Sequence, residues 1–584
     1  MAHNIIEKKQ QEALGKKEPF TIERPSDTLR RRLIEEQGLP ISGEASLGTD
    51  KLKPIPHWPD KRYPPETLSA DANIPIESNQ PLKVSLIDAL QIWARNNPDY
   101  QSRKEDVFRA ALSFDLAVNT FRPIFNAGTD SQIDADDTRD DTVTTWDNSG
   151  SAGWNQTFKN GLSASAAIGI DLLQLLTQGG TSTLGLNLDT SVSIPLLRGS
   201  GPHIVMEPLT QAERNVIYRL WDFDRYRRTF AVSVAQDYYA VLRQMDSVKN
   251  ARDNYSSAIR SARWSRRQAD AGRIPEIQVD QAVQRELSGR NGWVSAQEQL
   301  KNRLDSFKTG TLGLPTDALI ELDPNDMLQL RQRAEEYVKT MREASRSGVV
   351  QAVPPADAEV VLAPPSKEEA GPFEIGEELA VTLALKNRLD LRAANGAVFD
   401  AQRQVVVAAD ALGAGLTLGG SAQFADNDDD GALSFPGGRY AALLSLDLPI
   451  ERTRERNAYR NSLIDLERAT RAVQDLEDQI KLSIRNELRT LLESRESLKI
   501  QAQSVVVADK RVNSAQLFLE AGRAQIRDLL EAQDALLSAR NQLTSAVVNY
   551  RTAELQFQRD LDLLTITKEG LWQELSPEEL KNGI

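Results

Sequence analysis

Apolar residues recur every seven positions along the C-terminal half of the chain. Sustained heptads predict helices that are under-wound to 3.5 residues per turn and packed side by side in a left-handed coil. One helix is expected from about Glu455 to Ala521, on the order of 100 Å long at about 1.5 Å per residue, and a similar helix is expected from about Pro208 to Ala271. The first series is Ile484, Leu491, Leu498, Val505, Val512 and Leu519, and the second is Leu529, Leu536, Leu543, Tyr550, Phe557 and Leu564.

Each long helix ends at the same tripeptide. Ala271-Gly272-Arg273 and Ala521-Gly522-Arg523 close the two helices, and glycine is the residue that most often follows a helix C-terminus. Periodicity resumes within a few residues at about 275 and 524, so both tripeptides are predicted to be tips of helical hairpins.

The two halves of the chain repeat one another. Residues 271–307 and 521–557 share eleven identities at an offset of 250, among them Leu287-Ser288 with Leu537-Ser538. Weaker matches upstream keep the same order in both halves. The sequence therefore predicts two tandem copies of one unit, at about 82–322 and 375–564, each running helix, strand hairpin, long helix and return helix.

Alternating polarity predicts strands ahead of each long helix, at about 161–170 with 184–197 and at about 416–424 with 440–448. Such alternation occurs both in membrane strands and in ordinary half-buried strands, and for a lone strand the ordinary core is favoured. Its recurrence at the same place in both repeats reverses that preference in favour of the membrane. Residues 121–155 are interpreted as an insertion without a fixed place. The residues expected to face lipid are Leu184, Leu186, Leu188, Leu444, Leu446 and Leu448.

Several segments lie outside this plan. Residues 1–80 are expected to form an N-terminal extension that is partly disordered or extended, with an ordered arm anchored by Trp58, Tyr63 and Ile74 as the alternative. Residues 323–374 are interpreted as a linker or equatorial region with a proline-rich insert at 347–373, and 565–584 as a tail. Residues 426–431 resemble the start of a calcium loop, but Gly437 replaces the glutamate at position twelve, so a solvated hairpin tip is favoured.

The composition of the chain argues against most catalytic and metal-binding functions. The chain has 584 residues, a net charge of −14, no cysteine and three histidines. Acidity argues against nucleic-acid binding, and thiol catalysis, thiolate metal sites and disulfides are excluded. No catalytic, cofactor-binding or metal-binding residues are predicted, and an enzyme is disfavoured. No apolar run is long enough for a transmembrane helix, and the N-terminus lacks the apolar core of a secretory signal, which is expected for a cytosolic protein or a trimmed signal.

The assembled features resemble the TolC-like outer-membrane efflux family. The resemblance spans about residues 82–564 without the 347–373 insert. It rests on the duplicated plan, on Asn97-Pro98-Asp99, and on the block from Gly522 through Asp528-Leu-Leu-Glu531-Ala532 to Asn541. It implies a homotrimer, mainly α with membrane β, whose chains share a twelve-stranded β-barrel in the outer membrane and a helical barrel, or tunnel, across the periplasm. It also implies passive export of drugs or proteins, in efflux or type I secretion, from an inner-membrane pump through a periplasmic adaptor.

The resemblance also assigns site residues. Asp528 and Glu531 fall where the family places carboxylates around the periplasmic entrance, and Gln278 makes the first-repeat position neutral. The alternative is that Asp528 and Glu531 only stabilise the start of the helix, because its dipole favours acidic side chains there. The tips Gly272-Arg273 and Gly522-Arg523 correspond to adaptor-docking tips. The alternative function is a periplasmic coiled-coil scaffold or adaptor without a membrane pore.

Overall fold

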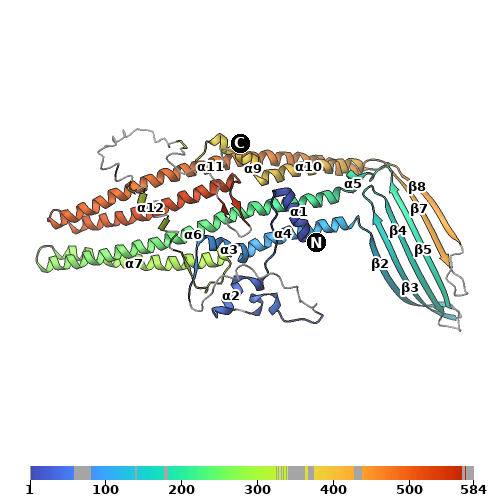
Figure 1. Ribbon diagram of the computed structural model, residues 1–584, viewed down its shortest axis with the longest axis horizontal. Helices are drawn as coiled ribbons and strands as arrows, with labels where there is room; N and C mark the ends of the chain where they lie inside the picture. Colours follow the sequence, from blue (N-terminus) through green and yellow to red (C-terminus); the bar gives the residue numbers. More distant parts are fainter. Residues whose placement is uncertain are drawn as a thin grey trace. The chain divides into compact units, whose positions relative to one another are not determined.

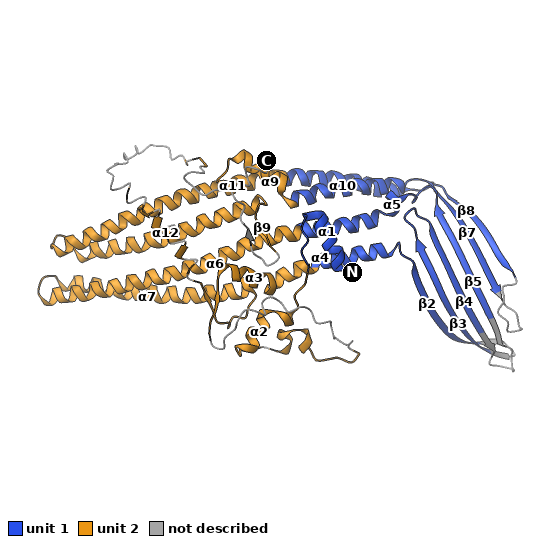
Figure 2. Cartoon of the chain, viewed as in Figure 1, with its two compact units in different colours: residues 1–20, 106–221, 390–476 blue, residues 21–105, 222–389, 477–584 orange. Residues whose placement is uncertain are grey.

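The computed structural model describes residues 2–41, 43–57, 80–138, 141–175, 182–323, scattered positions from 325 to 343, 362, 364–365, 374–426, 437–567 and 572–573. The described chain is mainly helical (Figure 1). It divides into two compact units (Figure 2), one made of residues 1–20, 106–221 and 390–476 and the other of residues 21–105, 222–389 and 477–584. No helix in these ranges is long and apolar enough to cross a bilayer.

The first unit contains one antiparallel sheet of six strands among the described residues, in the order β2-β3-β4-β5-β7-β8 (Figure 1). Six strands exceed the four per chain that a twelve-stranded barrel of three copies requires. The strands are β2 (Ile124–Thr138), β3 (Asp141–Thr157), β4 (Ser163–Leu175), β5 (Ser182–Pro195), β7 (Gly415–Asp426) and β8 (Gly438–Asp447).

The interpretation of residues 121–155 as an insertion is wrong, because they form most of β2 and β3. β3 pairs with β4 along thirteen residue positions, from Thr157 opposite Ser163 to Thr145 opposite Leu175. The aspartates of this stretch suggested a loop, yet they alternate with uncharged residues as strand side chains do. Residues 176–181 and 427–436, which include the calcium-like sequence after Asp426, lie outside the described residues.

Two long helices leave the sheet. Helix α6 (Glu207–Asp270) follows β5 after the short α5 (Pro202–Val205), and α11 (Thr453–Glu520) follows β8. Within the first unit α6 packs on α10 (Leu389–Asp410) through polar contacts: the Tyr218 hydroxyl donates to Asp400 Oδ2 at 2.8 Å, and Arg403 pairs with buried Glu207 at 2.9 Å. These contacts hold the helices where the strands begin and end.

The described part of the N-terminal extension contains two α-helices, where a partly disordered or extended arm was expected. Helix α1 (Ala2–Leu14) buries Ile6 and pairs Lys9 with Glu213 of α6, and the His3 ring contacts Phe108 of α4 (Pro98–Asn119) edge-on. In the second unit α2 (Leu29–Glu36) buries its leucines. The proposed anchors Trp58, Tyr63 and Ile74 lie outside the described residues.

The second unit holds the hairpin ends of the long helices. Helix α6 returns as α7 (Glu276–Ser306), and α11 returns as α12 (Ile526–Asp560). Around them lie α3 (Leu86–Asn96), α9 (Glu377–Asn387), the π-turn η5 (Phe307–Leu312), the parallel pair β1 (Leu82–Val84) with β6 (Ile320–Leu322), and β9 (Thr565–Ile566) with β10 (Trp572–Gln573). Residues 366–373 of the proline-rich segment lie outside the described residues, whereas Glu374 pairs with buried Arg495 of α11.

Heptad positions form the packing seams. The α11 residues Ile484, Leu491, Leu498, Val505 and Leu519 are buried, as are Leu529, Leu543, Tyr550 and Phe557 of α12. A second seam of small residues was not foreseen: α7 buries Ala282, Gly289 and Ala296, and α12 buries Ala532, Ala539, Ala546 and Ala553. Small side chains at seven-residue spacing let neighbouring helices approach closely; a Cβ on Gly289 would already lie 3.4 Å from the Tyr255 backbone.

Candidate functional site

The two hairpin ends are built by the same backbone motif. Gly272 and Gly522 both have φ +69°, a left-handed conformation that glycine adopts without a Cβ penalty. The Gly522 amide donates to Leu519 O at 3.0 Å and the Arg523 amide to Phe518 O at 2.8 Å; Gly272 and Arg273 repeat this at Ala269 and Gln268. This pair of bonds is the Schellman motif. Helices α6 and α11 end at Asp270 and Glu520, two residues before each glycine, so the predicted helix stops are confirmed.

The tips offer exposed cations. Arg273 and Arg523 are exposed, and the space around both glycines is open. Within the described part of the chain neither arginine forms an ion pair. The tips therefore present two uncompensated guanidinium groups on ordered turns.

Asp528 caps the helix that follows the second tip. It is the third residue of α12, and its Oδ2 accepts the backbone N–H of Gln525, the N-cap residue, at 3.0 Å. The Gln525 side chain accepts the Asp528 amide in return, which completes a capping box. Asp528 thus stabilises the start of α12, as the alternative to an entrance role expects, and its side chain is half-buried.

Glu531 lies one turn further and is exposed. Its carboxylate oxygens are 3.7 Å from Arg511 Nη2 and 3.6 Å from Arg527 Nε. Exposed pairs at such distances contribute little to stability, so Glu531 is held loosely between two cations.

Gln278 occupies in α7 the position that Asp528 holds in α12. The N-cap residue of α7 is Pro275, which has no backbone N–H to donate. A carboxylate at Gln278 could not make the capping bond that Asp528 makes. This difference in N-cap residue gives a physical reason for an amide in one repeat and an acid in the other.

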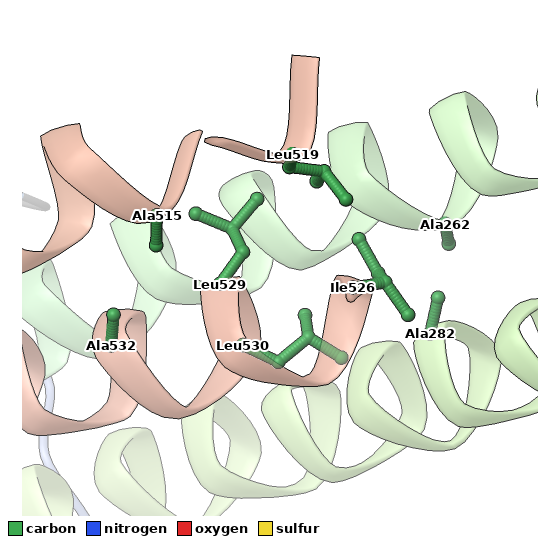
Figure 3. Close-up of a cluster of buried hydrophobic side chains, with 8 residues drawn as sticks. All are labelled: Ala262, Ala282, Ala515, Leu519, Ile526, Leu529, Leu530 and Ala532. Atoms are coloured by element: carbon green, nitrogen blue, oxygen red, sulfur yellow. The ribbon is translucent and has the colours of Figure 1, made fainter. Parts of the chain in front are cut away.

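An apolar cluster joins the two hairpins beneath the tips (Figure 3). Leu529 of α12 points toward Ala515 and Leu519 of α11, and Ile526 lies near Ala282 of α7. The buried members are Ala262, Ala282, Ala515, Leu519, Ile526, Leu529, Leu530 and Ala532. All four helices contribute, so the hairpin ends are packed on one another.

Polar pairs between the hairpins were missed by sequence reasoning. Asn250 Nδ2 donates to Asn541 Oδ1 at 2.7 Å, the Thr544 hydroxyl donates to Asp246 Oδ2 at 2.7 Å, and Arg285 pairs with Asp534. Asp534 and Asn541 lie seven residues apart on α12. A polar residue at a heptad position was the available signal.

A cavity of about 1010 Å³ lies between α6, α11 and α12 beside this cluster. Its apolar lining includes Trp264, Leu519 and Ile526, and its polar lining includes five arginines of α6 and α12 against two carboxylates, Asp253 and Glu520. The arginines are Arg260, Arg263, Arg266, Arg267 and Arg540. The arrangement suits an elongated partner with an apolar face and acidic groups.

Except at the strand ends, where Asp137 and Asp426 have the register of the uncharged residues, the sheet of the first unit carries its charged residues on one face. Following the pairing from β8 to β2, Leu446 lies opposite Leu416, Val192 opposite Ala164 and Trp154 opposite Phe125. We call this the uncharged face. Between residues 125–135, 144–156, 164–172, 186–194, 416–424 and 440–446 its members are aliphatic, aromatic, small or amide-bearing residues, with no charged side chain.

The opposite face of the same strands, the polar face, carries Asp130, Asp134, Asp147, Asp171 and Asp189. Of the residues expected to face lipid, Leu186, Leu188, Leu444 and Leu446 share the uncharged face. Leu184 has the same register, although its side chain lies outside the described residues, and Leu448 follows the end of β8.

A family model for outer membrane efflux proteins matches residues 380–561, from α9 to the end of α12. Residues 380–561 are an outer membrane efflux protein domain. The family resemblance drawn from the sequence is confirmed over these residues. No curated protein sequence matches the chain significantly.

Solved outer-membrane proteins share the fold of the efflux domain and of the chain around it. The outer-membrane channel OprN is 15% identical, with 86% of this chain and 98% of that chain covered and a TM-score of 0.56. The CmeC outer membrane channel of Campylobacter jejuni is 14% identical, with 90% and 97% covered and a TM-score of 0.55. The outer membrane protein VceC of Vibrio cholerae is 12% identical, with 82% and 95% covered and a TM-score of 0.57.

Proposed function

We propose that the chain is one subunit of an outer-membrane exit duct in a tripartite efflux or type I secretion assembly, through which drugs or proteins leave passively. The observation that carries this is the sheet with one uncharged and one polar face, whose strands lead directly into α6 and α11. A lipid-facing surface excludes charge, and a water-filled lumen accepts it. The helical tunnel would then stand in the periplasm.

Three copies are proposed because one chain leaves matching surfaces open. Strands β2 and β8 are the outer strands of the described sheet, and each has an unpaired edge, which invites pairing with another chain. Exposed apolar residues also recur seven apart on three helices, as in a coiled-coil seam without its partner. They are Leu287 and Val294, Phe399 and Val406, and Ile500 and Val507.

The test of this function is reconstitution in a planar bilayer. We expect the purified protein to require detergent, to run as a heat-resistant trimer and to form ion-conducting pores. A soluble monomer that forms no pores would refute the proposal and would favour the periplasmic scaffold.

We further propose that Asp528 and Glu531 ring the periplasmic entrance, with Gln278 as its neutral counterpart. Three copies of each acid around one axis would favour cations and repel one another. Because Asp528 also caps α12, Asp528→Ala would change two properties at once. Asp528→Asn keeps an oxygen that can accept the Gln525 amide but removes the charge, and it should lower cation preference while leaving thermal stability nearly unchanged.

Gln278→Asp is the converse variant. It adds charge where Pro275 offers no amide to cap, so it should raise cation preference, and α7 should gain only the stabilisation that the helix dipole gives an acid in its first turn. If ion preference stays constant in both variants, the entrance assignment is wrong and the cap is the whole role of Asp528.

We propose that a periplasmic adaptor docks at Gly272-Arg273 and Gly522-Arg523, with the arginine-lined cavity beside them receiving its helices. The uncompensated guanidinium groups support an acidic partner surface. Arg273→Glu with Arg523→Glu should weaken co-purification with the adaptor of the same assembly by tenfold or more. Arg290→Glu with Arg303→Glu, which makes the same charge change on exposed positions of α7, should not weaken it. If both double variants retain the adaptor equally well, the tips are not its docking site.

A further inference from the structure

Strands β2 and β3 are full members of the sheet, and they alter what three copies can build. β2 pairs with β3 over all fifteen of its residues, and β3 pairs with β4 over thirteen. Neither strand folds over a face of the sheet. They extend it by two strands beyond β4.

Both strands have the length and the polarity of membrane strands. A membrane β-strand needs about nine to eleven residues; β2 has 15 and β3 has 17. Asp130, Asp134 and Asp147 lie on the polar face, and Phe125, Ile133, Trp146 and Trp154 lie on the uncharged face. An appendage in water would have no reason to sort its charges in register with β4 and β5.

The tryptophans add a second, independent indication. Trp146 and Trp154 share the uncharged face of β3 and lie eight residues apart, roughly 27 Å at about 3.4 Å per residue. At the tilt of barrel strands this approaches the ~25 Å height of the apolar band, whose two borders are enriched in aromatic residues. Phe125 lies opposite Trp154 and Ile133 opposite Trp146, so β2 follows the same two levels.

We infer that three copies of this six-stranded sheet close into one barrel of eighteen strands, with β8 of each chain paired to β2 of the next. The inference rests on the proposed trimeric duct. Six strands per chain alternate in direction, so β8 and β2 of neighbouring copies are antiparallel and the barrel closes without a parallel pair.

The added strands widen the outer end of the duct. Barrel diameter grows roughly linearly with strand number, so eighteen strands give a diameter about 1.5 times that of twelve and a cross-section about 2.3 times as large. Barrels of this size leave an open aqueous channel. The membrane end of the duct therefore accepts bulky cargo, such as polypeptide segments, and leaves size selection to the helical end.

Disulfide trapping tests the closure directly, because the chain has no cysteine. Asn126→Cys or Asp130→Cys on β2 is combined with Ser445→Cys on β8, and each double variant is oxidised as the full-length protein in its outer membrane. In an eighteen-stranded barrel at least one combination should link neighbouring chains into dimers and trimers on non-reducing gels.

A twelve-stranded barrel would instead place β4 beside β8 of the next chain. Ser165→Cys or Gly169→Cys with Ser445→Cys would then link chains, whereas in the eighteen-stranded barrel β3 and β5 flank β4 and no such link forms. The matched control, Ser151→Cys with Gly169→Cys, joins residues that are paired within one chain. It should lose both thiols without changing the oligomer on the gel.

The mass of the trimer, measured on the cysteine-free protein, distinguishes a failure of the proposed function from a failure of the eighteen-stranded barrel. The absence of a trimer would refute the proposed function. A trimer that lacks β2–β8 links, or shows β4–β8 links, would overturn the eighteen-stranded barrel and leave the duct intact.

Discussion

Replacing Gly522 by alanine should loosen the tip of the α11–α12 hairpin. The residue has φ +69°, and an added Cβ would meet no atom within 4 Å. The whole penalty therefore comes from the backbone conformation and not from crowding. A left-handed conformation costs an L-residue about 1–2 kcal/mol.

That cost converts to a rate of local opening. A loss of 1–2 kcal/mol raises the open fraction of the tip about five- to thirty-fold, and amide exchange through local opening accelerates by the same factor. The Arg523 amide, which donates to Phe518 O at 2.8 Å, reports the motif itself. Hydrogen exchange followed by mass spectrometry on peptides covering residues 515–525 measures it.

Gly292→Ala is the matched control. Gly292 lies inside α7, has no positive φ, and an added Cβ there also meets open space. Alanine is a better helix former than glycine by about 1 kcal/mol, so exchange around Gly292 should slow. If Gly522→Ala leaves exchange unchanged while Gly292→Ala slows it, the conformational argument fails.

Three further predictions concern the small-residue seam, the uncharged face of the sheet and the buried Lys104. Gly289→Ala should be tolerated, since its Cβ makes ordinary contact at 3.4 Å, whereas Gly289→Leu should destabilise by about 1–3 kcal/mol through overpacking; equal melting temperatures would contradict the small-residue seam. Leu446→Asp puts charge on the uncharged face and should abolish heat-resistant trimers in the membrane, while Ser445→Asp, on the polar face, should not; equal trimer yields would contradict the face assignment. Burial lowers the pKa of Lys104 from 10.5 to about 8. Below about pH 8 Lys104 is protonated in both the folded and the unfolded protein, and the folded protein carries a buried charge. Between about pH 8 and 10.5 Lys104 is still protonated in the unfolded protein but largely neutral in the folded one, so the free energy of unfolding rises with pH. Lys104→Met should remove this rise, and an unchanged pH profile of chemical unfolding would contradict it.

The helical hairpins were predictable because their signals are local. Leucine spacing marks a seam whatever lies elsewhere in the chain, and Ile484 and Leu491 are fully buried as the heptads require. A glycine at φ +69° is equally a local demand. The small-residue seam escaped notice because Ala282 and Gly289 carry almost no hydrophobic signal, although their spacing is the same.

The missed features depend on distant partners. Asp130 and Asp134 look like loop residues until β3 and β4 show that they share one face of a sheet. Helix α1 has many polar residues, and its order comes from contacts with α4 and α6, including the Lys9–Glu213 pair some 204 residues apart in sequence. Neither the shared sheet face nor the contacts of α1 can be inferred from the residues adjacent in sequence.

The two hairpin ends also show which residues backbone geometry explains. Gly272 and Gly522 are identical because both turns need the same positive φ, and Asp528 differs from Gln278 because only one N-cap residue has an amide to satisfy. The arginines that follow the glycines have no such explanation: their amides complete the turns, but any residue except proline supplies an amide. Their exposed side chains are therefore the feature of the tips that most needs a partner to account for it.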